Sequence, residues 1–407
     1  MGRPRDLARD RTTLSLLLYS VVVIVLVGGC AHQREPAAAS GPSSPGASPW
    51  ALPTSTMRWN EYACELIARN QIGQVPAART LAYMNLAINN AIVTARQLGR
   101  APDGAAAGAA PAVLAYIFPK DEPAITTRLS GETASLGADR PRTEFAAGVE
   151  IGRATAAEDI ARAKSDRAGL TWTGPAPTGP DKWVSQTQPP RPPLGPRLGE
   201  MRPFFLTSGA ELRTAGPPAW DSAAFRAAVA EVRAVSDKRT NEQLRIAQYW
   251  EQLSGAFTAG FWNDVARSAI SSHGRTEPEA ARILALVHMT AIDAFIACHD
   301  TKYTYWVPRP TQVDPAIRLT IGVPNHPSYP SNHACVSGAI GLILDSQFPD
   351  QNGRYLAMAR QAGESRIYAG IHYRFDLDDG LVIARKVSAR ALQVGLPSDR
   401  PFTPVGR

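Results

Sequence analysis

The sequence of 407 residues predicts an all-α fold in which two helical halves are joined by a long loop. Alanine is abundant, and the alternation of β-branched residues that is typical of strands is scarce. Apolar residues recur at helical spacing from Trp59 onward, whereas residues 170–220 are dense in proline and glycine. With 44% hydrophobic and 19% charged residues, the chain has enough apolar side chains for a sizeable core, which argues against global disorder.

The N-terminal residues predict export. Arginines precede an apolar run at residues 14–27, which is too short and wrongly flanked for a membrane span, and the run ends in Val27-Gly28-Gly29-Cys30. Small residues before a cysteine are typical of a bacterial lipoprotein signal. Residues 1–29 are therefore predicted to be a signal peptide with lipidation at Cys30, and residues 30–56, rich in alanine, serine and proline, a tether. The alternative is an uncleaved anchor. Under both hypotheses the protein is extracytoplasmic, in the periplasm or cell envelope, and anchored to the membrane.

The rest of the chain is predicted to form an N-terminal helical half at 57–169, the connecting loop at 170–220 and a C-terminal helical domain at 221–407. Repeated prolines predict a second loop at 300–331. The helices that the apolar spacing predicts are 58–70, 77–98, 111–118, 124–136, 143–164, 221–235, 241–253, 258–271, 277–299, 333–348, 354–368 and 375–396.

Charge and cysteine usage exclude some classes of protein. The formal charge is +7, but several arginines lie in the predicted signal peptide, and no basic run is long enough to predict a nucleic-acid partner. Cys64, Cys298 and Cys335 lack the spacing of a metal site. They form either one disulfide with one free thiol or three buried free thiols.

Three blocks in the last third of the chain predict an anion-binding site. A phosphate-sized anion withdrawn from water needs several fixed donors and compensating positive charge. Lys302, Arg309 and Arg366 supply that charge, and arginine can meet two oxygens at once. Ser331 and the backbone N–H of Asn332 precede a predicted helix start, where donors naturally face an anion.

Two histidines supply the reactive groups of this predicted site. His372 is predicted to attack phosphorus or to bind a metal oxyanion, and Asp376, four residues on, is expected to fix its tautomer from the same helical face. His333 is predicted to be the general acid and base. Taken singly, such residues are more often an N-cap, a surface hydrogen bond or a solvated charge, and it is the ordered set that indicates a site.

The blocks resemble the signature of the type 2 phosphatidic acid phosphatase and vanadium-dependent haloperoxidase superfamily, which is Lys-x6-Arg-Pro, Pro-Ser-Gly-His and Ser-Arg-x5-His-x3-Asp. The preceding helix is similar to that of the soluble, haloperoxidase-like branch. The resemblance implies a helical bundle of the acid phosphatase/vanadium haloperoxidase type with its catalytic domain at 221–407. The matching residues are Lys302, Arg309, Pro310, Pro330, Ser331, His333, Ser365, Arg366, His372 and Asp376.

The resemblance also implies roles for these residues. The non-reacting oxygens of the bound oxyanion would be held by Lys302, Arg309, Ser331, Arg366 and the main chain of Asn332. His372 would be a phosphohistidine nucleophile in a phosphatase or the vanadium ligand in a peroxidase, His333 the acid and base, and Asp376 the residue that orients His372. Asn332 replaces the glycine of the family; asparagine tolerates a positive φ better than most residues, but its side chain is expected to narrow the pocket.

From these residues we favour an extracytoplasmic phosphatase that hydrolyses phosphomonoesters and needs no cofactor, since extracellular phosphatases are the more common role of such proteins. The alternative is a vanadium-dependent haloperoxidase with vanadate as cofactor. His326 favours this alternative, because similar peroxidases carry an aromatic residue or histidine there, suited to tuning bound peroxide. A histidine at this position could equally cap a turn or hydrogen-bond a substrate. A third hypothesis is a non-catalytic oxyanion-binding protein. The expected partner is a small phosphorylated or oxyanion substrate, and the sequence makes no prediction of oligomeric state.

Overall fold

The central element of the fold is α9 (Glu277–Tyr305), a long helix that is buried along almost its whole length. Thr276 and Glu279 form a capping box at its start.

The computed structural model describes residues 54–135, 141–252 and 256–406, so the predicted signal peptide, Cys30 and most of the tether lie outside the described residues. Within these ranges one stretch, Glu277–Val313, has the length and apolar composition of a membrane span, and 94% of its apolar window is buried inside the protein.

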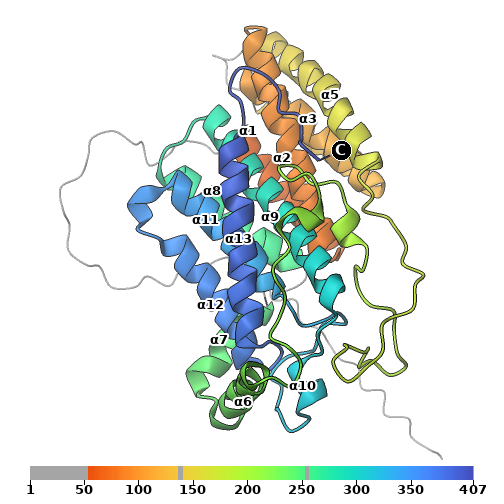
Figure 1. Cartoon of the computed structure of the whole chain (residues 1–407). Helices are drawn as coiled ribbons and strands as arrows, with labels where there is room; N and C mark the ends of the chain where they lie inside the picture. The colour runs from red at the N-terminus through yellow and green to blue at the C-terminus, as the bar shows by residue number, and fades with distance from the viewer. Residues whose placement is uncertain (1–53, 136–140, 253–255, 407) are drawn as a thin grey trace, which may run out of the picture. The chain divides into compact units, whose positions relative to one another are not determined.

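Helices of the N-terminal half cover one side of α9 and helices of the C-terminal half cover the other (Figure 1). Helix α2 packs on α9, and α3 lies between α2 and α5, while α11 and α13 pack on α9 from the second half. No strand occurs in the described residues, and the predicted all-α class is confirmed. The bounds of the other helices are α1 Ser55–Arg69, α2 Gln74–Gln97, α3 Pro102–Ile117, α4 Glu122–Ala134, α5 Arg142–Lys164, α6 Ala223–Lys238, α7 Asn241–Gln252, α8 Ala256–Ser272, α10 Pro310–Val313, α11 Gly338–Gln347, α12 Arg354–Tyr368 and α13 Arg374–Val394.

Three boundaries differ from the predicted ones for identifiable reasons. Helix α1 begins at Ser55, inside the segment predicted as tether, because the Thr54 side chain caps it. Helix α3 begins at Pro102 instead of Pro111, and its small residues let it approach α5 so closely that a Cβ on Gly108 would lie 2.1 Å from the Val149 oxygen. Helix α9 continues to Tyr305, so Lys302 lies on a helix and not in the predicted loop.

The proline-rich segment at 170–220 is a packed cover over α9, seen in green in Figure 1. It contains two short 3-10 turns, Leu198–Glu200 and Gly209–Leu212. The buried Asp293 carboxylate of α9 accepts the backbone N–H groups of Phe204 and Phe205, each at 2.7 Å, and of Leu206 at 3.3 Å. Since these peptide groups have left water, the carboxylate satisfies donors that would otherwise stay unpaired.

Replacement of Asp293 by alanine tests this anchor. Asp293→Ala should lower the free energy of unfolding by about 3 kcal/mol or more, because each orphaned buried N–H costs about 1–3 kcal/mol. Urea unfolding measures the change. Glu158→Ala, an exposed carboxylate on α5, is the control and should change the stability by less than about 0.5 kcal/mol. Equal stability of the two variants would contradict the anchoring role.

Candidate active site

The three sequence blocks meet where α9 ends, next to the starts of α10 and α13 and to α12. Lys302 lies on the last turns of α9, Arg309 is the N-cap of α10, and Arg366 lies near the end of α12. A π-helical turn at His333–Ser337 carries His333. The side chains that are withdrawn from solvent here are Lys302, Arg309, His326, Ser331, Arg366, His372 and Asp376.

His372 is held by Asp376. Nδ1 of the imidazole lies 2.7 Å from Oδ2 of Asp376, and that oxygen also accepts the Ser328 hydroxyl at 2.5 Å and the Tyr373 N–H at 3.1 Å. The predicted pairing is present, but the predicted reason, a shared helical face, is wrong: His372 precedes α13, and Asp376 lies in its first turn. An ionised carboxylate only accepts, so Nδ1 carries the hydrogen and Nε2 keeps a lone pair.

Arg309 bridges His372 and His326. Its Nη1 donates to Nε2 of His372 at 3.0 Å and to the Ile371 carbonyl at 2.8 Å, and its Nη2 donates to Nδ1 of His326 at 3.1 Å. Burial, and then the charges of Arg309 and Lys302, hold the pKa of His372 well below its usual range. His372 is therefore neutral, and its Nε2 lone pair points at a guanidinium that stays charged, because burial lowers the pKa of Arg309 only to about 10.

Lys302 supports the loop beneath the site. Its Nζ donates to the carbonyls of Pro327 and Ser328, both at 3.0 Å, and of Pro330 at 2.5 Å. Burial lowers the pKa of Lys302 to about 8, so the ammonium remains mostly charged at pH 7. In this arrangement Lys302 contributes positive charge and loop geometry, and its predicted direct contact to an oxyanion would require one of these bonds to be exchanged.

Arg366, His333 and Ser331 form the other side of the site. Nη1 of Arg366 donates to Oε2 of Glu251 on α7 at 2.9 Å, and Nε donates to the Ser365 hydroxyl at 2.9 Å. In the part of the chain that the structure describes, Nε2 of His333 and Oγ of Ser331 are buried without a protein partner. Burial and the Arg366 charge hold the pKa of His333 well below its usual range, so this histidine is neutral. Buried polar atoms without partners are expected where a ligand binds.

Asn332 is accommodated without strain. Its φ is −58°, a helical value that any residue adopts, so tolerance of a positive φ is not required. Its side chain turns toward α9, where Oδ1 accepts from the Cys298 thiol at 3.0 Å and Nδ2 donates to Nε2 of His299 at 3.2 Å. Cys64, Cys298 and Cys335 are all free; Cys298 and Cys335 are buried, as in the second of the two predicted alternatives, whereas Cys64 is partly buried.

Three residues of the site were not predicted from the sequence: Ser328, Glu251 and His299. Ser328 lies three residues before the expected Ser331, and this closeness was a usable signal. Glu251 and His299 reach the site only through the packing of α7 and α9, which no local pattern reports.

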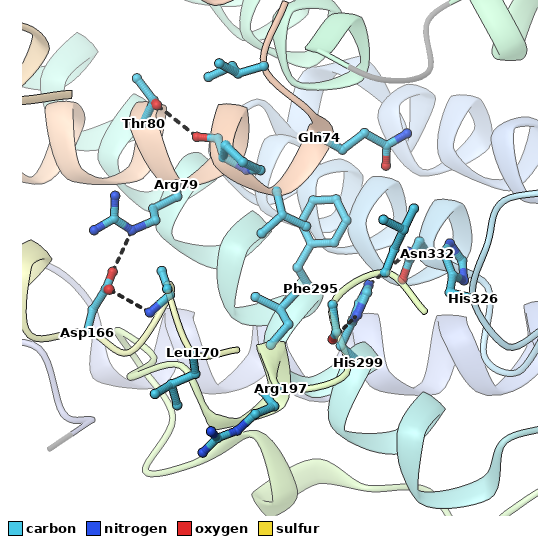
Figure 2. A pocket seen from close by; sticks show the side chains of 18 of the residues that line it. Gln74, Arg79, Thr80, Asp166, Leu170, Arg197, Phe295, His299, His326 and Asn332 are labelled. Atoms are coloured by element: carbon cyan, nitrogen blue, oxygen red, sulfur yellow. Dashed lines mark hydrogen bonds and ion pairs between the residues drawn. The ribbon is translucent and has the colours of Figure 1, made fainter. Parts of the chain in front are cut away.

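A cavity of 1340 Å³ opens from the site. His326, His333, Arg366 and His372 line one part of it, and residues of α2, the end of α3 and the segments at 163–170 and 194–198 line the rest. Figure 2 shows side chains from these elements around the open space, with His299, Asn332 and His326 on one side.

Comparisons with known proteins support the resemblance that the three blocks predict. Residues 282–395 match the family model of the PAP2 superfamily. A vanadium-dependent bromoperoxidase from Ascophyllum nodosum is 29% identical over 122 residues; the match covers 23% of this chain and 20% of that protein, so the chain spans about a fifth of this curated relative. The resemblance predicted from the three blocks is thus confirmed over residues 282–395, the segment that matches the PAP2 superfamily domain model.

Solved structures share the fold over most of the chain. A bacterial vanadium-dependent iodoperoxidase has a TM-score of 0.71 at 20% identity, covering 86% of this chain and 98% of that one. A holo-type bacterial vanadium-dependent chloroperoxidase has a TM-score of 0.63 at 12% identity, covering 83% and 92%. The predicted fold type, that of the vanadium haloperoxidases, is confirmed.

The buried Ser331 hydroxyl gives a test of anion binding. Ser331→Ala should leave stability nearly unchanged but weaken binding of inorganic phosphate or vanadate about tenfold or more, because a hydrogen bond to a charged group contributes about 1.5–3 kcal/mol. Calorimetric titration and urea unfolding measure the two quantities.

Ser388→Ala is the matched control for Ser331→Ala. The Ser388 hydroxyl donates to the Ala339 carbonyl at 3.1 Å, so its loss should cost about 1 kcal/mol of stability and leave anion affinity unchanged. If both variants bind the anion equally well, Ser331 does not contact it.

Proposed function

We propose that this protein is a vanadium-dependent haloperoxidase, which oxidises a halide with hydrogen peroxide. One observation carries the proposal: the neutral His372, with its Nδ1–H fixed by Asp376, presents the Nε2 lone pair inside a buried cluster of cations. That is the ligand a vanadium centre requires, and the surrounding charge suits its oxygens. The peroxidases among the structural relatives support this alternative better than the phosphatase that the sequence favoured.

The residues present fit vanadate. His372 would hold the metal. The groups that would face its oxygens are Arg309, Ser331, Arg366 and the N–H of Asn332, while Lys302, bonded to three carbonyls, would contribute positive charge. The buried Ser331 Oγ and His333 Nε2, which lack protein partners within the described ranges, are suitably polar for such a guest. When bound, vanadate supplies a Lewis acid that activates peroxide for attack by a halide.

His333 and His326 complete the chemistry of the proposed site. His333 is neutral, so its Nε2 can accept a proton from peroxide and return it when hydroxide leaves. His326 accepts a hydrogen bond from Arg309, the same guanidinium that contacts His372. Through this guanidinium His326 would influence bound peroxide. Burial, which excludes water, strengthens each of these interactions.

Vanadate dependence tests the function. The full chain with vanadate, peroxide and bromide should brominate a halogen-accepting dye, and His372→Ala should reduce the rate to that of free vanadate, because the metal ligand is gone. His273→Ala, in the turn after α8 and paired with Asp350, is the control and should retain full activity.

The competing hypotheses are separated by measuring phosphate-ester hydrolysis and phosphate binding beside bromination. Hydrolysis of p-nitrophenyl phosphate that vanadate inhibits, with no bromination, would establish the phosphatase. Tight phosphate binding without turnover of either kind would establish a binding protein.

We also propose that the protein is an extracytoplasmic lipoprotein, on the basis of the small residues that precede Cys30. Cys30→Ser should move the protein from the membrane pellet to the soluble fraction of cells, because the thiol that carries the lipid is lost. Cys64→Ser is the control and should stay in the pellet. Retention of Cys30→Ser with the membranes would instead support an uncleaved anchor.

A further inference from the structure

The cavity is much larger than the proposed reaction requires. A tetrahedral oxyanion with a halide and peroxide displaces a handful of water molecules at about 30 Å³ each, on the order of 200 Å³. The cavity measures 1340 Å³. Most of it lies away from His372, against the N-terminal half and the connecting segment, which the PAP2 superfamily domain does not include.

This larger part, which we call the outer chamber, has apolar walls. They are contributed by α2 and the turn before it, the end of α3, the connecting segment and α9. Figure 2 shows Leu170 and Phe295 bordering the open space, with the ion pair between Arg79 and Asp166 at one side. The apolar residues of the chamber include Ile72, Val75, Tyr116, Phe118, Leu170 and Phe295.

The solvent side of the outer chamber is cationic. Lys120 and Lys164 line it and are exposed, and no carboxylate within residues 54–135, 141–252 and 256–406 forms an ion pair with either. The arginines of the chamber are different: Arg79 is paired with Asp166 at 2.7 Å, and Arg167 and Arg197 both reach Glu200 at 2.7 Å. The Lys164 ammonium also lies over the ring of Tyr116, 5.7 Å from its centroid, a contact that leaves its charge without a carboxylate partner in the described residues. Both lysines therefore offer positive charge to an anionic group of a bound molecule.

We infer that the outer chamber binds an aromatic organic acid, with its rings against the apolar walls and its acid group at Lys120 and Lys164. The apolar walls favour rings over a sugar or peptide, and the lysines favour an acid over a neutral compound. The chamber and the oxyanion site share one cavity. A ring bound in the chamber would therefore lie where hypohalous acid, formed beside His372, leaves the site.

The inference deepens the proposed function, on which its chemical part rests: the bound acid would be the halogen acceptor. Hypohalous acid formed at the site would react with an electron-rich ring carbon, which supplies the electron pair for the new carbon–halogen bond. The oxygen–halogen bond breaks, and the ring proton leaves with the hydroxide as water. A bound acceptor would be halogenated in preference to a free one, because its local concentration is high.

Binding is measured first, on the full chain without vanadate, so the result does not depend on turnover. The probes are 6-hydroxy-2-naphthoate and the neutral 2-naphthol, titrated by calorimetry. The double variant Lys120→Gln, Lys164→Gln should weaken naphthoate binding about three- to tenfold and leave naphthol unchanged. Leu170→Trp, which fills the chamber, should weaken both probes and leave vanadate binding intact.

Two matched controls separate these effects from general ones. Lys238→Gln with Lys386→Gln removes the same charge from exposed positions outside the cavity, and Leu98→Trp adds the same bulk at a position that is 60% exposed. Both should leave probe binding unchanged. The inference is overturned if neither probe binds, or if the control variants weaken binding as much as the chamber variants.

Competition under turnover separates this inference from the proposed function. With vanadate, peroxide and bromide, naphthoate should be brominated ahead of a soluble diketone that traps free hypobromous acid, and Leu170→Trp should shift bromination to the trap without changing total bromide oxidation. Bromination at the free-solution ratio in the unmodified protein overturns the inference but not the peroxidase. Naphthoate binding with the expected variant pattern, but no bromination, supports the chamber and overturns the peroxidase.

Discussion

The bond between His372 and Asp376 organises the whole C-terminal site. Asp376 Oδ2 gathers the imidazole Nδ1, the Ser328 hydroxyl and the Tyr373 N–H, while its own carbonyl accepts the N–H of Ser331 at 2.9 Å. One residue therefore joins the start of α13 to the loop that leads to His333. If the carboxylate were lost, the tautomer of His372 and the position of Ser331 would change together.

Positive charge is the second constraint on this fold. Lys302, Arg309 and Arg366 are buried close to one another, and the carboxylates that oppose them are the buried Asp376 and the partly exposed Glu251. Burial of charge is costly unless a partner of opposite sign compensates it. A bound oxyanion would supply that partner, so the same arrangement that destabilises the free site favours binding of a small anion.

The sequence predicted what depends on local order in the chain. The spacing of His372 and Asp376, and the motif order of Lys302, Arg309 and Arg366, were enough to place one site. The helical location of Lys302 was missed because the repeated prolines suggested a loop, although none of them lies before residue 308. Two sets of contacts could not be predicted from the sequence, because residues from different helices make them. Asn332 is hydrogen-bonded to Cys298 and His299, and Arg366 is paired with Glu251. The outer chamber was missed for the same reason.

A crystal structure of the protein grown with orthovanadate would show directly whether His372 holds an oxyanion. We expect one oxyanion bonded to Nε2 of His372, within hydrogen-bond distance of Ser331 and Arg366, with His333 beside it. Vanadate bound elsewhere on the protein, or a His372 whose Nε2 remains bonded to Arg309 in crystals saturated with vanadate, would contradict it.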